Sequence, residues 1–73
     1  MPKIPVVSSA AAIRVAIKAG FSVVRQKGSH IILRNEYGAR VTIPNHKTLK
    51  PGTLLRIIKG LQLSKEEFIG MLD

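Results

Sequence analysis

The stretch FSVVRQKGSHIILRNEYGARVTIP, residues 21–44, decides the fold of this chain of 73 residues. It contains three runs rich in β-branched residues, a composition that favours strands. The runs are residues 21–27, 30–35 and 39–44. Gly28-Ser29 suits a two-residue hairpin, and Glu36-Tyr37-Gly38 suits a three-residue hairpin that ends on a left-handed glycine. The stretch therefore predicts a three-stranded antiparallel sheet.

The lengths of the two turns fix the register, and the register decides which side chains share a face. If Lys27 pairs with His30 across the first turn, the second turn places Arg34 opposite Arg40. The residues expected to face the helices are Val24, Ile31, Leu33, Val41 and Ile43. The open face is expected to present Arg25, Lys27, His30, Arg34, Arg40 and Thr42, with Val23 and Ile32 among them. Like charges opposite each other destabilise a sheet, so the Arg34 and Arg40 pair indicates an anion site.

A helix is expected before the strands, over residues 10–19. Ser8 or Ser9 is a suitable N-cap, and Gly20 suits the left-handed position after the last turn. The residues expected to form its apolar stripe are Ile13, Ala16, Ile17 and Gly20.

Two further helices are expected after the strands. Pro51 lies where one of them begins and Gly60 where it ends, and Ser64 and Glu67 have the spacing of a capping box for the other. The predicted class is therefore α+β, in the order α-β-β-β-α-α, with helices on one face of a three-stranded antiparallel sheet. No repeat or linker divides the sequence, so residues 1–73 are expected to form one domain.

Charge is distributed unevenly along the chain. There are 12 Lys and Arg against 4 Asp and Glu, a formal net charge of +8, and Glu36 is the one acidic residue before Glu66. A surface of this kind favours a polyanionic partner, above all nucleic acid. Two other interpretations stay open: the charge keeps the protein soluble, or it meets an acidic protein.

What the sequence lacks excludes several classes of protein. Without cysteine there is no disulfide framework and no zinc finger. No window approaches the length of a membrane span, and the opening Met1-Pro2-Lys3-Ile4-Pro5 lacks the apolar segment of a signal peptide. We therefore expect a cytoplasmic protein with no membrane partner.

Few residues are available for catalysis. Two-metal nucleases need several carboxylates around adjacent cations, and outside the C-terminal tail the chain has Glu36 alone. Its two histidines, His30 and His46, are too few for a zinc site within one chain. Nucleotide-binding loops are missing as well, so no metal and no cofactor are expected.

RNA cleavage without a metal ion remains open, because RNA supplies its own nucleophile, the 2′-hydroxyl. His30 begins the second strand among the cations of the open face, which makes it a candidate general acid or base. The register brings the end of the third strand beside the start of the second, so His46 is a candidate second proton donor. The alternatives are a surface histidine without chemistry at position 30, and a loop histidine that at most contacts phosphate at position 46.

A series of short motifs has an order and spacing typical of one family. They are Gly20-Phe21, Val24-Arg25-Gln26-Lys27-Gly28-Ser29-His30, Arg40-Val41-Thr42-Ile43-Pro44-Asn45-His46, Leu49-Lys50-Pro51-Gly52-Thr53-Leu54, Leu63-Ser64 and Glu66-Glu67-Phe68. Together they resemble the HicA family of mRNA interferase toxins, also called YcfA-like proteins. The resemblance covers nearly the whole chain.

The resemblance implies a fold similar to a double-stranded RNA-binding domain and a ribosome-independent endoribonuclease that cleaves mRNA. It also implies a protein partner, a HicB antitoxin encoded beside the toxin, which holds it inactive. The family's catalytic histidine, in a Gly-Ser-His motif, corresponds to His30, with Gly28 and Ser29 before it. Many relatives have another histidine or a tyrosine next, where this chain has Ile31, which the register turns inward.

The likeness to double-stranded RNA-binding domains adds a second expectation. Lysines at the start of their final long helix reach phosphates, and Lys47 and Lys50 lie in the matching region here. The alternative is that the two lysines solvate a loop. The residues expected to bind RNA are Arg25, Lys27, Ser29, Arg34, Arg40, His46, Lys47 and Lys50. A noncatalytic RNA-binding module with the same basic face is the alternative function.

Overall fold

The computed structural model describes residues 5–72, and the expectation drawn from the first four residues lies outside that range. The elements are α1 (Ser9–Lys18), β1 (Ser22–Lys27), β2 (His30–Arg34), β3 (Arg40–Pro44), α2 (Pro51–Gly60) and α3 (Lys65–Met71). This order confirms the predicted α+β class, and the three strands form one antiparallel sheet in the order β1-β2-β3.

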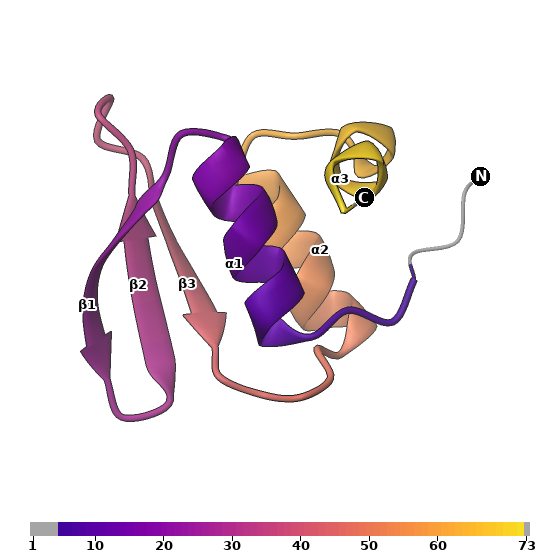
Figure 1. Ribbon diagram of the computed structural model, residues 1–73, viewed down its shortest axis with the longest axis horizontal. Coiled ribbons are helices and arrows are strands. Elements are labelled where there is room, and N and C mark those ends of the chain that lie inside the picture. The colour runs from indigo at the N-terminus through magenta and orange to yellow at the C-terminus, as the bar shows by residue number, and fades with distance from the viewer. Residues whose placement is uncertain (1–4, 73) are drawn as a thin grey trace.

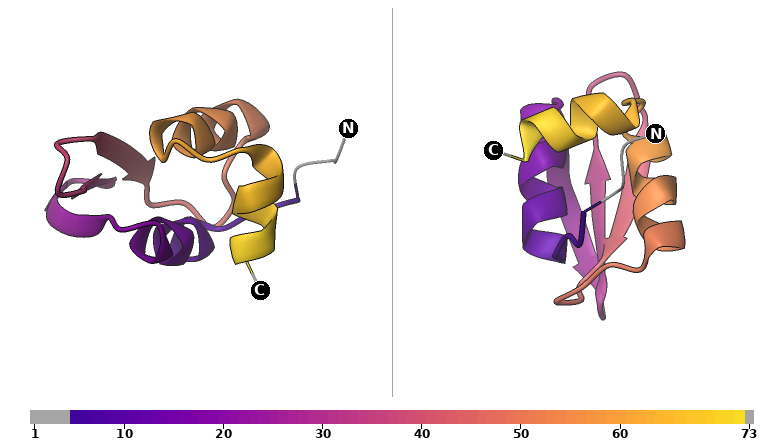
Figure 2. Two further views of the ribbon diagram at one scale, coloured as in Figure 1. Left: turned by 90° about the horizontal axis from the view of Figure 1, so that it is seen from above. Right: turned by 90° about the vertical axis from the view of Figure 1, so that its right-hand side faces the viewer.

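The molecule has a sheet on one side and its helices on the other (Figure 1). α1 and α2 lie next to each other against one face of the sheet, and α3 crosses their far side (Figure 2). The largest fully buried side chains are Phe68, Leu33, Ile43, Leu54, Ile57 and Val15, which come from all three helices and two strands. The opposite face of the sheet is left open. None of the helices described between residues 5 and 72 is long and apolar enough to cross a membrane.

Both hairpins form as predicted. Lys27 pairs with His30 and Arg34 with Arg40, while Gly28 and Gly38 have positive φ values of 59° and 87°. In the second turn, the side-chain oxygen of Asn35 accepts hydrogen bonds from the backbone N–H groups of Tyr37 and Ala39, at 3.0 and 2.8 Å. The turns therefore fix the register because their backbone groups are satisfied locally.

The predicted faces are correct on β2 and β3 and wrong for two valines of β1. The register shifts between Val23 and Arg25, so that Val23 pairs with Leu33, and Val24 is the extra residue of a bulge. Val23 thus lies on the helix side of the sheet and Val24 on the open side, the reverse of the prediction. Both side chains are half exposed, at 50% and 51%, because the helices pack mainly against β3 and not against β1.

The apolar stripe predicted for α1 is also partly wrong. Its buried residues are Ser9, Ala12, Val15 and Ala16, whereas Ile17 is 54% exposed. Alanine at two of the four buried positions lets the helix lie close to the sheet, and this turns Ile17 toward the outside. The predicted N-cap is confirmed, because the Ser8 hydroxyl accepts a hydrogen bond from the Ala11 N–H.

The ends of the other two helices follow the predicted pattern, with one difference. α3 begins with a full capping box, in which Ser64 and Glu67 each accept from the other's backbone N–H, at 3.0 and 2.8 Å. α2 ends at Gly60, but the left-handed residue after it is Gln62, with φ of 62°. Gly60 instead serves packing: a Cβ there would lie 3.2 Å from Cγ2 of Val41 on β3. The close approach of α2 to β3 therefore depends on glycine.

Candidate functional site

Three adjoining hollows lie on the surface around the open face. The sheet hollow, of about 330 Å³, is lined by Val24, Arg25, Lys27, Ile32, Arg34 and Arg40. The central hollow, also of about 330 Å³, lies between β3 and α2. The loop hollow, of about 650 Å³, is lined by the loop between β3 and α2 and by Thr53. Arg40 lines both the sheet and the central hollow, while Pro44 and Thr53 line both the central and the loop hollow. Each hollow therefore adjoins the next through residues that line both.

His30 is located in the central hollow. It is the first residue of β2, the middle strand, where it pairs with Lys27 on one side and Pro44 on the other. Its neighbour Ile31 is buried against the helices, so the alternation of the strand turns His30 outward. A hydrogen bond of 2.6 Å from the Asn45 N–H to the Ser29 carbonyl extends the pairing past the strand end. The backbone on both sides of His30 is thus held by β1 and β3.

The other wall of the central hollow comes from α2. Thr53, Arg56, Ile57 and Gly60 line it, and their spacing of three and four residues places them along one side of the helix. Arg56 is exposed, while Ile57 next to it is buried in the core. Arg56 is not among the candidate residues that the sequence predicted. Its helical spacing from Thr53 and Gly60 is a signal that would have grouped it with this wall.

The sheet hollow gathers the cations that were predicted to share the open face. Arg25 and Lys27 come from β1, Arg34 from β2 and Arg40 from β3, with Val24 and Ile32 between them. In the described part of the chain, no acidic residue lines this hollow. Arg34 and Arg40 are direct partners in the ladder, and an anion bound between them would relieve their repulsion. The structure brings Arg34 and Arg40 together as expected, and the anion between them stays a prediction.

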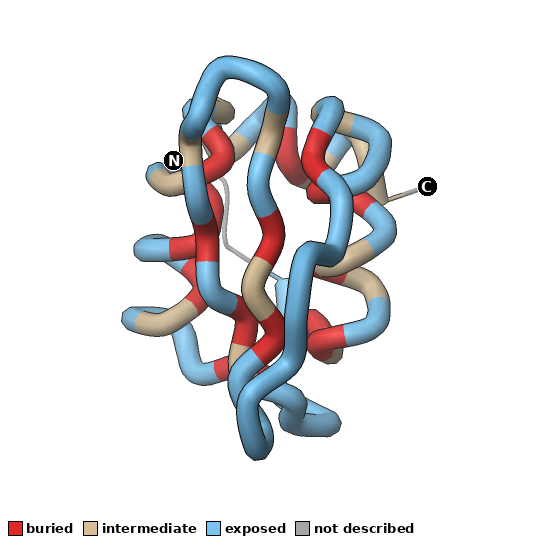
Figure 3. Tube along the Cα trace, turned by 90° about the vertical axis from the view of Figure 1, so that its left-hand side faces the viewer, coloured by how far each residue is buried: buried red, intermediate tan, exposed pale blue. Residues whose placement is uncertain are grey.

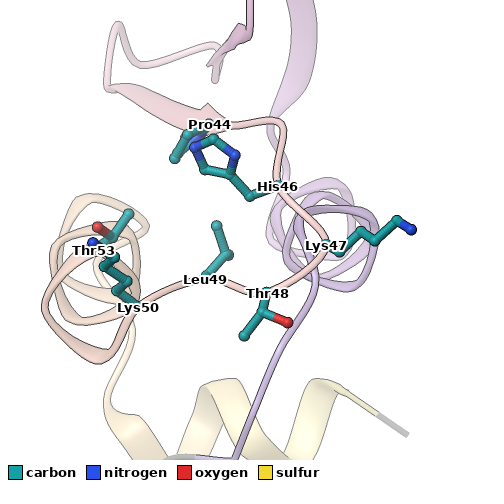
Figure 4. A pocket seen from close by; sticks show the side chains of 7 residues that line it. All are labelled: Pro44, His46, Lys47, Thr48, Leu49, Lys50 and Thr53. Carbon is teal, nitrogen blue, oxygen red and sulfur yellow. The ribbon is translucent and has the colours of Figure 1, made fainter.

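The loop hollow holds three of the other predicted residues: His46, Lys47 and Lys50 (Figure 4). Its floor is the buried Leu49, and the ring of His46 lies at the end near Pro44, while the Lys47 amine points away. Lys50 is the N-cap of α2 and makes no side-chain capping bond.

The loop is tied to the segment before α1 by backbone hydrogen bonds. The Ser9 N–H donates to the His46 carbonyl at 3.1 Å, and the Leu49 N–H donates to the Val7 carbonyl at 2.8 Å. The loop hollow therefore has a defined shape even though its polar side chains are exposed.

The structure does not bring the two histidines into one hollow. His30 lines the central hollow and His46 the loop hollow, and Pro44 and Thr53 form walls common to both. Ser29, another predicted RNA ligand, lines none of the three hollows, and its carbonyl is used by Asn45. Between residues 5 and 72, no three His, Cys, Asp or Glu side chains gather in a way that could hold a metal ion.

Fold and surface together define a small basic α+β protein with a cationic open sheet and a histidine at the start of its middle strand. The family model for the HicA toxin of bacterial toxin–antitoxin systems matches residues 10–63. The match covers most of the sequence, so the protein belongs to the HicA toxin family, as its motifs indicated. It is a toxin of a toxin–antitoxin system and has an antitoxin as its partner. No match to this chain was found among curated proteins.

Proposed function

We propose that this toxin is an endoribonuclease that cleaves mRNA without a metal ion, with His30 as a general acid or base. The observation that supports the proposal most is the position of His30 in a hollow that it shares with Arg40, at one end of the cationic sheet. A proton-transfer group and a donor for phosphate oxygens are the two parts that RNA cleavage needs from a protein. Because the proposed substrate is mRNA, we expect the toxin to act in the cytoplasm.

The reaction uses the 2′-hydroxyl of the substrate as its nucleophile. Acting as a base, His30 takes the proton from this hydroxyl while its oxygen forms a bond to phosphorus and the bond from phosphorus to the 5′-oxygen breaks. The 5′-oxygen takes up a proton from a donor acid or from water. The products are a 2′,3′-cyclic phosphate and a 5′-hydroxyl. Acting as an acid, His30 instead protonates the leaving 5′-oxygen, and water takes the proton from the 2′-hydroxyl. Arg40 stabilises the negative charge that grows on the phosphate oxygens.

We expect the sheet hollow and the loop hollow to bind the parts of the RNA strand away from the cleaved bond. Arg25, Lys27 and Arg34 offer charges for phosphates in the sheet hollow, and Lys47 and Lys50 do the same beside the start of α2. Contacts to phosphates position a strand without reading its sequence. Phe21 and Phe68 are buried, so the aromatic ring open to stacking with a base is that of Tyr37, which is 86% exposed in the second turn.

The proposed partner is a HicB-type antitoxin that inactivates the toxin by covering the open face. Carboxylates of such a protein would pair with Arg25, Arg34 or Arg40, the charges that otherwise meet RNA. A complex in which this face stays exposed would contradict inhibition by occlusion.

The test compares His30→Ala with His46→Ala on labelled mRNA. For His30→Ala we expect the cleavage rate to fall by about 10²–10⁴-fold, the usual contribution of general acid–base catalysis, and growth arrest to be lost. Urea unfolding of this variant should match the wild type, because His30 is exposed. His46→Ala should keep its cleavage rate within about a factor of ten, since a phosphate contact contributes less than proton transfer.

Two further readouts separate the proposal from its alternative. Cleavage should persist in EDTA and leave cyclic phosphate ends, because no step uses a metal ion. A noncatalytic RNA-binding module would bind RNA in a salt-sensitive way, give no products, and bind equally well after His30→Ala. Wild-type cleavage rates in the His30→Ala variant would contradict the proposed mechanism.

A further inference from the structure

We propose that Arg56 is a third catalytic residue beside His30 and Arg40, which contacts the reacting phosphate from the helix wall of the central hollow. This inference rests on the proposed function and adds a residue to its site. Arg40 on β3 and Arg56 on α2 would then hold the phosphate from two walls, with His30 at the same hollow.

The position of Arg56 is fixed by the packing of α2. Ile57, the next residue, is 2% exposed, and Gly60 lies so near β3 that an added Cβ would meet Val41 at 3.2 Å. A helix held at both of these points can neither rotate nor move away from the strand without losing core contacts. Arg56 is therefore held at the border between the buried side of α2 and the solvent, where the helix faces the hollow.

The charges around the hollow favour an anion between the two arginines. Within the described residues, no carboxylate lines the central hollow, so neither guanidinium has an acidic partner there. Two cations that line one hollow repel each other, and a negative group that binds between them lowers that repulsion. A phosphate gains charge as the 2′-oxygen bond forms, and a guanidinium donates two parallel hydrogen bonds to such a group. The arrangement therefore suits the transition state better than the bound substrate.

Lys59 provides a matched control within the same helix. It is exposed and carries the same charge as Arg56, three residues further along α2, but it lines none of the three hollows. A general electrostatic attraction of RNA to α2 would make the two residues equivalent. A specific contact with the reacting phosphate would make Arg56 alone important for the rate.

The experiment measures single-turnover cleavage for Arg56→Ala, Arg56→Lys and Lys59→Ala, together with binding of an RNA whose 2′-hydroxyls are methylated. Arg56→Ala should slow cleavage by about 100-fold or more, the usual effect of removing one transition-state donor. Its affinity for the methylated RNA should fall by less than about fivefold, a loss typical of one exposed charge. Arg56→Lys should recover part of the rate, because it keeps the charge and loses the planar fork. Lys59→Ala should cleave within about twofold of the wild type, since surface substitutions have small effects.

His30→Ala and the wild type are measured in the same assay, so that the two proposals can fail separately. If His30→Ala is inactive while Arg56→Ala matches Lys59→Ala in rate, the role of Arg56 is wrong and the proposed function stands. If Arg56→Ala loses binding and rate by the same factor, the residue only attracts RNA, and the catalytic role is again wrong. A wild-type protein without cleavage products would overturn the proposed function itself.

Discussion

The two edges of the sheet differ in what lies behind them. Val23, Leu33 and Val41 form one row across the sheet, all on its helix side. Val41 on β3 is 6% exposed because α1 and α2 pack against that strand, whereas Val23 on β1 is 50% exposed. In the view onto the open face, all of β1 is exposed, while buried and exposed residues alternate along the other two strands (Figure 3).

The difference separates two kinds of surface. The edge backed by α2 has a hollow with two walls, and there a histidine and two arginines face the same space. At the bare edge, Arg25 and Lys27 line the sheet hollow, whose walls come from the three strands alone. Catalysis needs side chains that rigid elements hold around the reacting atoms from more than one side. Electrostatic binding of a polyanion needs only positive charge. The protein thus combines a candidate catalytic edge with a candidate binding edge in one small sheet.

The largest expected effect comes from forcing α2 away from β3. Gly60→Val places a branched side chain against Val41, and we expect the free energy of unfolding to fall by about 2–3 kcal/mol, as for other overpacked cores. The cleavage rate should fall as well, because Arg56 moves with the helix. Urea unfolding measures the first effect and a single-turnover assay the second.

Gly70→Val is the control for this substitution. A Cβ at Gly70 meets nothing within 4 Å, so the same change there should have a much smaller effect on stability and none on cleavage. Equal losses in the two variants would mean that the contact between Gly60 and Val41 has no special role.

A smaller effect is expected from truncating the two valines at the ends of one row. Val41→Ala removes two buried methyl groups and should lower the free energy of unfolding by about 2 kcal/mol. Val23→Ala should change it by less than about 0.5 kcal/mol, because the side chain is half exposed. Chemical denaturation of both variants measures the difference. Similar losses would show that β1 is covered in solution, by a second molecule or by the chain itself.

The smallest expected effect concerns the binding edge. Arg34→Gln removes one of two opposed charges, so the free protein should gain a few tenths of a kcal/mol, on the order of a cross-strand pair. RNA binding should weaken, and the slope of log affinity against log salt should become shallower by about 0.7, the value for one phosphate contact to a single strand. Arg14→Gln on α1 is the control, since Arg14 is exposed and lines no hollow in the described chain. An unchanged salt slope for Arg34→Gln would remove the sheet hollow from the binding surface.

Local signals in the sequence predicted most of the fold. Glycine at positions 28 and 38 fixed the hairpins and their register, since a left-handed backbone there is open to few other residues. Serine caps placed the starts of α1 and α3. The same patterns placed His30 outward and beside the cations, and the motifs around it indicated the family. These features depend on neighbours in the chain, which a sequence displays directly.

The predictions that differ from the structure share another cause, which lies in the packing of one element on another. The bulge at Val24 exchanged the faces of two valines, and Ile17 turned outward because alanines met the sheet instead. Arg56 joined the candidate site through the packing of α2 on β3, while His46 lines the loop hollow and not the central hollow of His30. Each of these outcomes depends on how closely two elements approach each other. The periodicity of apolar residues along the sequence does not predict that distance.

The sequence by itself thus determined the order of elements, the turns, the register of two strands and the basic character of the open face. All of these follow from local backbone preferences and from the alternation of side chains along a strand. Tertiary structure alone decided which edge of the sheet α2 would back. That choice follows from packing, through the lack of a side chain at Gly60 and the burial of Ile57. It brought Arg56 to the hollow of His30 and left β1 bare.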